Sequence, residues 1–302
     1  MRLAVKEALY GVVASLFYRW RTSIGSARAP KVMSIEQTVD HVLTTGCSLV
    51  RFGDGELAIL RGQRISYQDP APQLSEALRD ALVIDRPNVL ICVPGVFDGM
   101  PEIDAAPRHW WIKQLLRGNA QWLALTGTDR LFGNAFLSRP YLMYQNFDAA
   151  RIARLFESIK ALWADRHVTI VEGNETRFGV GNDLLDNATS VTRILCPSRN
   201  AFEALDLIEA RCLTVTPDNL FLIALGPAAK PLVVRLWRAG RRALDIGHLD
   251  IEYEWFVRGA TGPILVPGKA MDGTVGPRQD DATQHDRLYF DQIIGTIEAQ
   301  PS

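Results

Sequence analysis

Length, composition and charge describe an ordinary globular chain. It has 302 residues, 47% of them hydrophobic and 22% charged, which is enough for one large domain or two small ones with a buried cleft. The 33 basic and 34 acidic residues give a formal net charge of −1, so no overall field attracts nucleic acid or an anionic membrane. Any anion must therefore bind at a local site.

The N-terminal segment, residues 1–30, places apolar residues at helical intervals between basic ones. Its apolar stretch is too short to span a bilayer, and Glu7 between basic flanks does not suit a secretory signal. We expect an amphipathic helix and a linker here, in a cytoplasmic protein. The helix could lie on the inner face of the membrane, or pack on its own domain or on a second subunit of a homo-oligomer.

The cysteines support a reducing compartment. They lie far apart, form no CxxC pair and mostly fall within apolar runs, which predicts buried thiols. The four are Cys47, Cys92, Cys196 and Cys212.

Helical and strand-like patterns alternate after Pro30. Ser34 and Gln37 suit a capping box, and Gly46 ends the first helical pattern. Strands are predicted at residues 47–52, 88–94, 167–173, 191–197, 219–226 and 242–247, and helices at residues 72–83, 148–163, 200–211 and 227–239. Strands that are apolar on both faces and alternate with helices predict an α/β fold, with a mainly parallel sheet and helices on both faces.

Two stretches are less regular. Residues 95–144 mix aromatic residues with Gly, Asn and Arg; they could cover the C-terminal edge of the sheet and shape an acceptor pocket, or form a loop-rich satellite core. Residues 259–285 are rich in Gly, Pro, Asp and Gln, which predicts a flexible loop or linker before a short helical pattern at residues 288–297.

The segment RFGDGE is the first candidate site. Gly53 and Gly55 flank Asp54, so the backbone can turn sharply and let Asp54 and Glu56 converge on one point. Mg²⁺ and Mn²⁺ prefer carboxylate oxygens and can bridge phosphate groups, which makes this a candidate metal site; a simple polar turn is the alternative. Arg51 could pair with these carboxylates or bind a phosphate.

The segment DIGHLDIEYEW, residues 245–255, is the second. In an extended chain His248, Asp250, Glu252 and Glu254 share one face, whereas in a helix His248 pairs with Glu252 and Asp250 with Glu254. Such concentrated negative charge requires a cation, arginine side chains or solvent to compensate it. A bound cation would make this a functional site; a solvated acidic start of a helix is the alternative.

Two further segments could bind a nucleotide. In LGPAAK, Lys230 lies in the first turn of a predicted helix, where unpaired N–H groups attract phosphate, although an ordinary strand-to-helix connection looks the same. Asn182, Asp183 and Asn200 could bind a base or ribose, with Arg193 or Arg199 on a phosphate. Capping of the next helix is the alternative for Asn200.

Taken in order, RFGDGE, GNDLL, RILCPSRNAF, LGPAAK and DIGHLDIEYEW resemble the GT-D-type glycosyltransferases, from about Ser34 to Phe256. The resemblance implies a Rossmann-like domain at residues 31–258, between the segment 1–30 and a tail at 259–302. It also implies transfer of a sugar from a nucleotide donor, typically a UDP-sugar, to a glycan or glycoconjugate acceptor, with a divalent metal. The family's usual LGPTAK reads LGPAAK here, so Ala228 lacks a hydroxyl for phosphate.

The resemblance also assigns roles to residues. Asp54 and Glu56 match the metal-binding DxE pair, and His248, the third candidate metal ligand, belongs to a motif near the metal and the reacting sugar. A carboxylate of that motif, Asp250 first and Glu252 or Glu254 next, would accept the proton of the acceptor hydroxyl. The donor-binding roles are our own inference from residue type, and the candidates are Arg51, Asn182, Asp183, Arg193, Asn200 and Lys230.

Two other function classes fit the same residues. Clustered carboxylates also serve metal-dependent phosphohydrolases and nucleases, which release product without an acceptor. A non-catalytic nucleotide- or glycan-binding module would bind without turnover. Assays of turnover and of acceptor dependence distinguish the three.

Overall fold

The computed structural model describes residues 30–98, 100–127, 130–144, 148–271, 274–276 and 284–298. The predicted N-terminal amphipathic helix, with its expected membrane or subunit contact, falls outside these residues. Within them, no helix has both the length and the apolar character needed to cross a bilayer.

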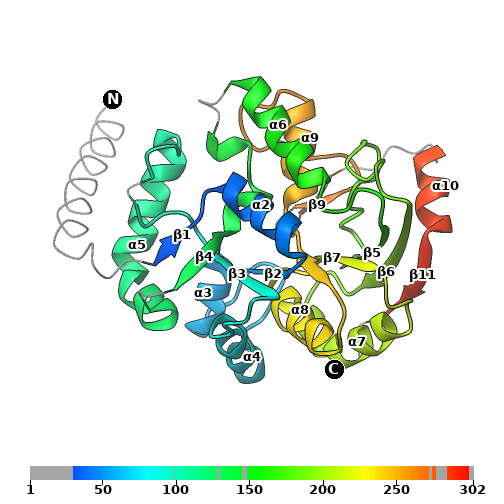
Figure 1. Ribbon diagram of the computed structural model, residues 1–302, viewed down its shortest axis with the longest axis horizontal. Helices are drawn as coiled ribbons and strands as arrows, with labels where there is room; N and C mark the ends of the chain where they lie inside the picture. Colours follow the sequence, from blue (N-terminus) through cyan, green and yellow to red (C-terminus); the bar gives the residue numbers. More distant parts are fainter. Residues whose placement is uncertain are drawn as a thin grey trace.

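A nine-stranded sheet forms the centre of the molecule, in the order β1-β4-β3-β2-β8-β7-β5-β6-β11 (Figure 1). All of its strand pairs are parallel. The strands are β1 (Lys31–Val32), β2 (Ser48–Arg51), β3 (Val89–Val93), β4 (Leu131–Asn134), β5 (His167–Gly173), β6 (Ser190–Cys196), β7 (Leu220–Ala224), β8 (Ala243–Asp245) and β11 (Ile293–Thr296). The six predicted strands are confirmed.

Helices cover both faces of this sheet. They are α2 (Ile35–Thr45), α3 (Asp54–Leu60), α4 (Pro72–Leu82), α5 (Ala105–Thr126), α6 (Ala149–Lys160), α7 (Leu205–Leu213), α8 (Ala229–Arg238), α9 (Leu249–Val257) and α10 (Gln284–Asp291). Figure 1 shows α2 and α6 on one face and α4, α7 and α8 on the other. The predicted α/β class with a parallel sheet is confirmed.

Short connections complete the chain. Single 3₁₀ turns are η2 (Ala135–Ser138), η3 (Leu142–Tyr144), η4 (Ala201–Ala204) and η5 (Gly226–Ala228). A small antiparallel pair, β9 (Ala270–Met271) and β10 (Thr274–Val275), follows α9.

Local sequence explains the first helix and the central strands. Ser34 accepts a hydrogen bond from the Gln37 N–H, Gln37 accepts one from the Ser34 N–H, and Gly46 ends α2 in the left-handed region at φ 66°. All five residues of β3 and of β7 are buried, as expected for strands covered on both faces. The four cysteines are buried and free, as predicted.

Two stretches differ from their sequence interpretation. Residues 95–144 contain α5, a 22-residue helix, and β4, instead of irregular structure. In α5 the buried Trp111 adjoins the exposed Trp110, so the apolar residues do not form one clear stripe. The helix predicted at residues 288–297 was wrong in its second half. Helix α10 ends at Asp291, and Ile293–Thr296 form β11, which pairs with β6.

The strand order places a crevice at the centre of the sheet. From β2 the chain moves through β3 to β4 on one side, and it later returns through β7 and β8 to pair with β2 on the other side. Connections leave in opposite directions at the β2–β8 junction. In open α/β sheets, ligands bind at the carboxyl ends of the strands beside such a junction.

Candidate active site

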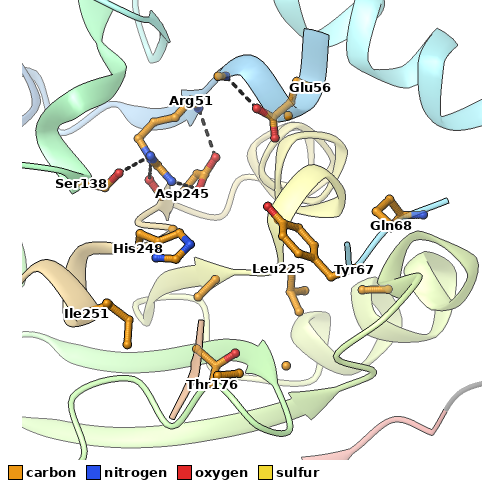
Figure 2. Close-up of a pocket in the computed structure, with 18 of the residues that line it drawn as sticks. Arg51, Glu56, Tyr67, Gln68, Ser138, Thr176, Leu225, Asp245, His248 and Ile251 are labelled. Atoms are coloured by element: carbon orange, nitrogen blue, oxygen red, sulfur yellow. Dashed lines mark hydrogen bonds and ion pairs between the residues drawn. The ribbon is translucent and has the colours of Figure 1, made fainter. Parts of the chain in front are cut away.

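A cleft of about 260 Å³ lies at the carboxyl ends of the strands. Arg51 of β2, Gly173 of β5 and Asp245 of β8 contribute to its walls. Figure 2 shows His248 and Ile251 at one end of this cleft, and Tyr67 and Gln68 at the other. Both carboxylate-containing segments singled out in the sequence therefore reach one cavity.

Arg51 and Asp245 join the two strands at the centre of the cleft. The Arg51 guanidinium donates to Asp245 Oδ1 at 2.8 Å and to the Asp245 carbonyl at 2.7 Å, and it also contacts the Ser138 hydroxyl (Figure 2). Burial opposes ionisation of Asp245, but the charges and hydrogen bonds of Arg51 and Lys230 outweigh it and lower the pKa of the carboxyl. Arg51 therefore pairs with a carboxylate that the sequence did not single out.

Gly247 makes room for this pair. Its φ is +44°, and a Cβ there would lie 1.9 Å from Nη2 of Arg51. A larger residue would thus have to adopt a left-handed backbone and also displace the guanidinium.

We expect Gly247→Ala to lower the free energy of unfolding more than Gly240→Ala does. Gly240 also has a positive φ, +75°, but an added Cβ there meets nothing within 4 Å. In both variants alanine must adopt a left-handed backbone, which lowers the free energy of unfolding by about 1–2 kcal/mol. In Gly247→Ala the new Cβ also crowds Arg51, which lowers it further by about 1–3 kcal/mol. Chemical denaturation measures the difference; equal losses would mean that Arg51 moves aside without cost.

Lys230 links the RFGDGE segment to Asp245. It is only 4% exposed, and its ammonium lies 2.8 Å from Glu56 Oε1, 3.2 Å from Asp245 Oδ2 and 3.0 Å from the Gly226 carbonyl. These three acceptors match the three N–H groups of the ammonium. In this arrangement Lys230 neutralises two carboxylates, and phosphate binding by Lys230 stays a prediction.

Asp54 and Glu56 begin α3 directly after β2. Glu56 is buried, and its Oε2 accepts a hydrogen bond from the Gly53 N–H at 2.7 Å, which closes the first turn of the helix. Asp54 is exposed and also lines the cleft. Protein groups thus hold the buried Glu56 carboxylate, whereas the Asp54 carboxylate is exposed to the cavity.

The second acidic segment forms helix α9, the helical form of the two considered. Asp250 and Glu254 lie one turn apart and meet the same two donors, Asn182 and Lys269. The cation that compensates their charge is therefore a lysine of the protein. Glu252 points elsewhere and accepts hydrogen bonds from the Tyr141 and Leu142 N–H groups, both at 3.0 Å.

The environments of these carboxylates differ. Burial raises the pKa of Glu252, because Arg139 and the two N–H donors only partly offset the loss of solvent. For Glu254 burial acts in the same direction, but Lys269, Asn182 and Arg258 outweigh it and lower the pKa. Of the four candidate residues in this segment, His248 and Asp250 line the cleft, whereas Glu252 and Glu254 do not.

Comparison with known proteins identifies the family. The sequence profile described as "Glycosyltransferase GT-D fold" matches residues 49–273, which is most of the chain. The chain belongs to this family. The predicted family is confirmed.

Two bacterial relatives of the GT-D-fold chain carry corresponding names. The probable glycosyl transferase Gly of Streptococcus gordonii is 39% identical over 89% of this chain and 39% of its own length. Glycosyltransferase GlyD of Streptococcus pneumoniae serotype 4 (strain ATCC BAA-334 / TIGR4) is 36% identical over 88% of this chain and 32% of its own length. The chain thus spans well under half of each of these relatives.

Solved structures match over nearly their whole length. A highly conserved domain of unknown function 1792, described as having a distinct glycosyltransferase fold, shares a TM-score of 0.85 and 34% identity over 92% of this chain and 99% of that chain. A glycosyltransferase with the same domain from Streptococcus sanguinis has a TM-score of 0.83 and 36% identity, covering 89% and 100% of the two chains.

The GT-D-fold chain places two of its predicted donor-binding residues away from the cleft. Arg193 is 2% exposed and pairs with Glu172 at 2.7 Å, behind the loop that follows β5. Asp183 contacts Lys160 and the Tyr253 hydroxyl. Neither Arg193 nor Asp183 lines the cleft, whereas Arg199, the other arginine considered for phosphate, does.

Asn182 and Asn200 act on residues that line the cleft. Asn182 donates to Asp250 at 2.8 Å. Asn200 adopts a left-handed backbone at φ 52°, and its side-chain oxygen accepts from the Asp69 N–H at 2.8 Å, while its own N–H donates to the Tyr67 carbonyl. Asn200 thereby fixes the loop that brings Tyr67 and Gln68 to the cleft.

Sequence reasoning missed Asp245, Lys269 and Tyr67, among other residues of this site. Asp245 had a usable signal, because a carboxylate that ends an apolar strand must be paired if it is buried. Lys269 and Tyr67 lie in polar, Gly- and Pro-containing stretches with no pattern that marks them. Only their contacts in the fold reveal them.

Proposed function

We propose that this chain transfers a sugar from a nucleotide diphosphate donor, a UDP-sugar, to a hydroxyl group of a glycan or glycoconjugate, with a divalent Mn²⁺ or Mg²⁺ ion. The observation that carries the proposal is the cleft at the β2–β8 junction, where Asp54 and Glu56 share a cavity with Arg51 and Lys230. Membership of a glycosyltransferase family supports it.

The residues present fit a metal that is shared with the substrate. Within the described ranges, no three His, Cys, Asp or Glu side chains are grouped so that they could hold a metal ion. Mg²⁺ is commonly bound by one or two carboxylates together with substrate phosphates and water. Asp54 and Glu56 suit this mode, because both line the cleft and Asp54 is exposed.

When bound by Asp54 and Glu56, the metal would supply positive charge to the departing diphosphate. Lys230 pairs with Glu56 and Arg51 pairs with Asp245, and these ion pairs fix the orientation of both carboxylates in a buried site. Arg199, which is exposed at the cleft, is placed for a phosphate or ribose of the donor. These residues hold the leaving group while the sugar is transferred.

The two ends of the cleft suit different parts of the reaction. At one end Tyr67 offers an aromatic face and Gln68 lies beside it, which suits a nucleoside. His248 and Ile251 lie at the other end, where His248 and the neighbouring Asp250 line the cavity and offer polar groups that suit sugar hydroxyls. We assign the donor nucleoside to the first end and the acceptor to the second.

Asp250 is the base that we propose. It lines the acceptor half of the cleft, unlike Glu252 and Glu254. As the acceptor oxygen bonds to the anomeric carbon, its proton passes to Asp250 and the bond from that carbon to the diphosphate oxygen breaks, leaving the electron pair on the nucleoside diphosphate. This displacement inverts the anomeric centre.

Calorimetric titration of UDP tests the shared metal. We expect the affinity for UDP to rise about tenfold or more when Mn²⁺ is present, and the affinity for Mn²⁺ to rise by the same factor when UDP is present. Each ligand supplies oxygens that the other needs. UDP binding that Mn²⁺ leaves unchanged would contradict this proposal.

A screen of nucleotide sugars then tests the reaction itself. A donor should raise the melting temperature in the presence of Mn²⁺, since a ligand that binds the folded state stabilises it. The same donor should be consumed only when an acceptor is added. Phosphate release without an acceptor would indicate a phosphohydrolase, and binding without turnover would indicate a binding module.

A further inference from the structure

Lys269 is a buried cation behind the acidic helix α9. Its side chain is 4% exposed, and its ammonium lies 2.6 Å from Asp250 Oδ2 and 3.2 Å from Glu254 Oε1. Asp250 lines the cleft, but Lys269 does not. The lysine therefore contacts the proposed base from outside the cleft.

The backbone around Lys269 is fixed at several points. Its N–H donates to the Val266 carbonyl at 3.2 Å, and its carbonyl accepts from the Gly276 N–H at 3.1 Å. The next residue, Ala270, donates to the Glu175 carbonyl at 2.8 Å, and both Ala270 and Glu175 line the cleft. This segment thus ties the position of Lys269 to the wall of the site.

The two carboxylates beside Lys269 would otherwise repel each other. Asp250 and Glu254 are 2% and 5% exposed, so little solvent screens their charges. Asn182 also bridges them, donating at 2.8 Å to Asp250 Oδ1 and to Glu254 Oε1, but an amide carries no net charge. The Lys269 ammonium contacts both carboxylates and supplies positive charge that offsets their repulsion.

Hydrogen bonds hold both carboxylate oxygens of Asp250. Oδ1 accepts from Asn182 and Oδ2 from Lys269. A carboxylate oxygen can accept a second hydrogen bond, so this grip still leaves acceptor capacity for a substrate hydroxyl. The side chain is thereby held in one orientation, and its oxygens can still accept a hydrogen bond from the substrate.

We propose that Lys269 is a positioning residue, which holds the Asp250 carboxylate beside Glu254 in the orientation that accepts the acceptor proton. The inference rests on the proposed sugar transfer and names the residue on which its base depends. Lys269 itself does not touch the substrate.

The test compares Lys269→Met, Glu254→Gln and the double variant. Lys269→Met leaves two buried carboxylates without their cation, and we expect kcat to fall about 100-fold with the donor KM changed less than about threefold. Glu254→Gln removes the repulsion and keeps the Lys269–Asp250 pair, so its kcat is the reference against which the double variant is compared. The double variant should recover to within about tenfold of wild type, because the repulsion is gone there too.

Arg258→Met is the matched control. Arg258 contacts Glu254 Oε2 at 3.0 Å from the exposed side and does not contact Asp250, so its loss removes a cation from the same cluster without releasing the base. We expect kcat near wild type for Arg258→Met, and a partial recovery for Lys269→Arg relative to Lys269→Met.

Three kinetic results would overturn the inference: a Lys269→Met variant with normal kcat, a double variant no better than Lys269→Met, or a loss confined to KM. Crystal structures of the variants give a readout that does not depend on activity, since Asp250 should rotate away from the cleft in Lys269→Met and return in the double variant. An unmoved Asp250 would also refute it. Lack of any transfer by the wild-type protein would instead refute the proposed function.

Discussion

Asp54→Asn is expected to lower sugar transfer by about 100- to 1,000-fold, the size of effect seen when one group that stabilises a developing negative charge is removed. Asp54 is exposed at the start of α3, so the loss of one charge there should leave the melting temperature within a few degrees of wild type. Steady-state kinetics with saturating Mn²⁺, together with a thermal melt, measure both effects.

Two companion variants sharpen this expectation. Asp85→Asn changes another exposed carboxylate, which pairs with Arg130 outside the cleft, and should leave transfer unchanged. Glu56→Gln should lose transfer as well, but with a larger loss of stability, because Glu56 also pairs with the buried Lys230. Full activity in Asp54→Asn would mean that the RFGDGE segment is a structural turn.

Arg51→Met is expected to cost about 3–5 kcal/mol of unfolding free energy at pH 7, the range found when one partner of a buried ion pair is removed. Asp245 is 1% exposed and would keep only Lys230, which Glu56 shares, and the backbone N–H of residue 51. The variant should also lose transfer, since the carboxyl ends of β2 and β8 would no longer be joined at the cleft. Chemical denaturation and the transfer assay measure the two losses.

The loss of stability in Arg51→Met should shrink on acidification. In the wild type the pKa of Asp245 is lowered, so its contribution to stability is present above the ordinary carboxyl pKa and is lost as the pH falls through the lowered value. In the variant Asp245 protonates at higher pH, and the wild-type advantage should decrease below about pH 4.

Arg151→Met serves as the control for this experiment. Like Arg51, Arg151 forms ion pairs, in this case with Glu36 and Glu102, but its side chain is 35% exposed. Pairs of this kind contribute about 0–1 kcal/mol, so this variant should be nearly neutral at every pH. A destabilisation by Arg51→Met that does not depend on pH would mean that packing, and not the charge of Asp245, is what Arg51 provides.

The strands and most helices could be predicted because their signals are local. The runs at 88–94 and 219–226 are apolar throughout, and they form β3 and β7, which are buried on both faces. The capping box of Ser34 and Gln37 needs only neighbouring residues, and it forms as predicted.

Elements that depend on distant partners were not predictable in the same way. The strand β11 exists because Ile293–Thr296 pairs with β6, about a hundred residues earlier in the chain, and its four residues carry too little pattern of their own. Helix α5 has apolar residues spread around its circumference, so its buried side is set by packing and not by periodicity.

In the candidate site, too, local features could be predicted from the sequence and contacts between distant residues could not. By itself the sequence determined that Asp54 and Glu56 follow a buried strand and begin a turn, because glycine spacing and strand ends are properties of adjacent residues. Only the tertiary structure decided that Arg51 pairs with Asp245, that Lys230 bridges Glu56 and Asp245, and that Lys269 faces Asp250. Such ion pairs form where packing brings buried charges within reach, and no local pattern specifies that meeting.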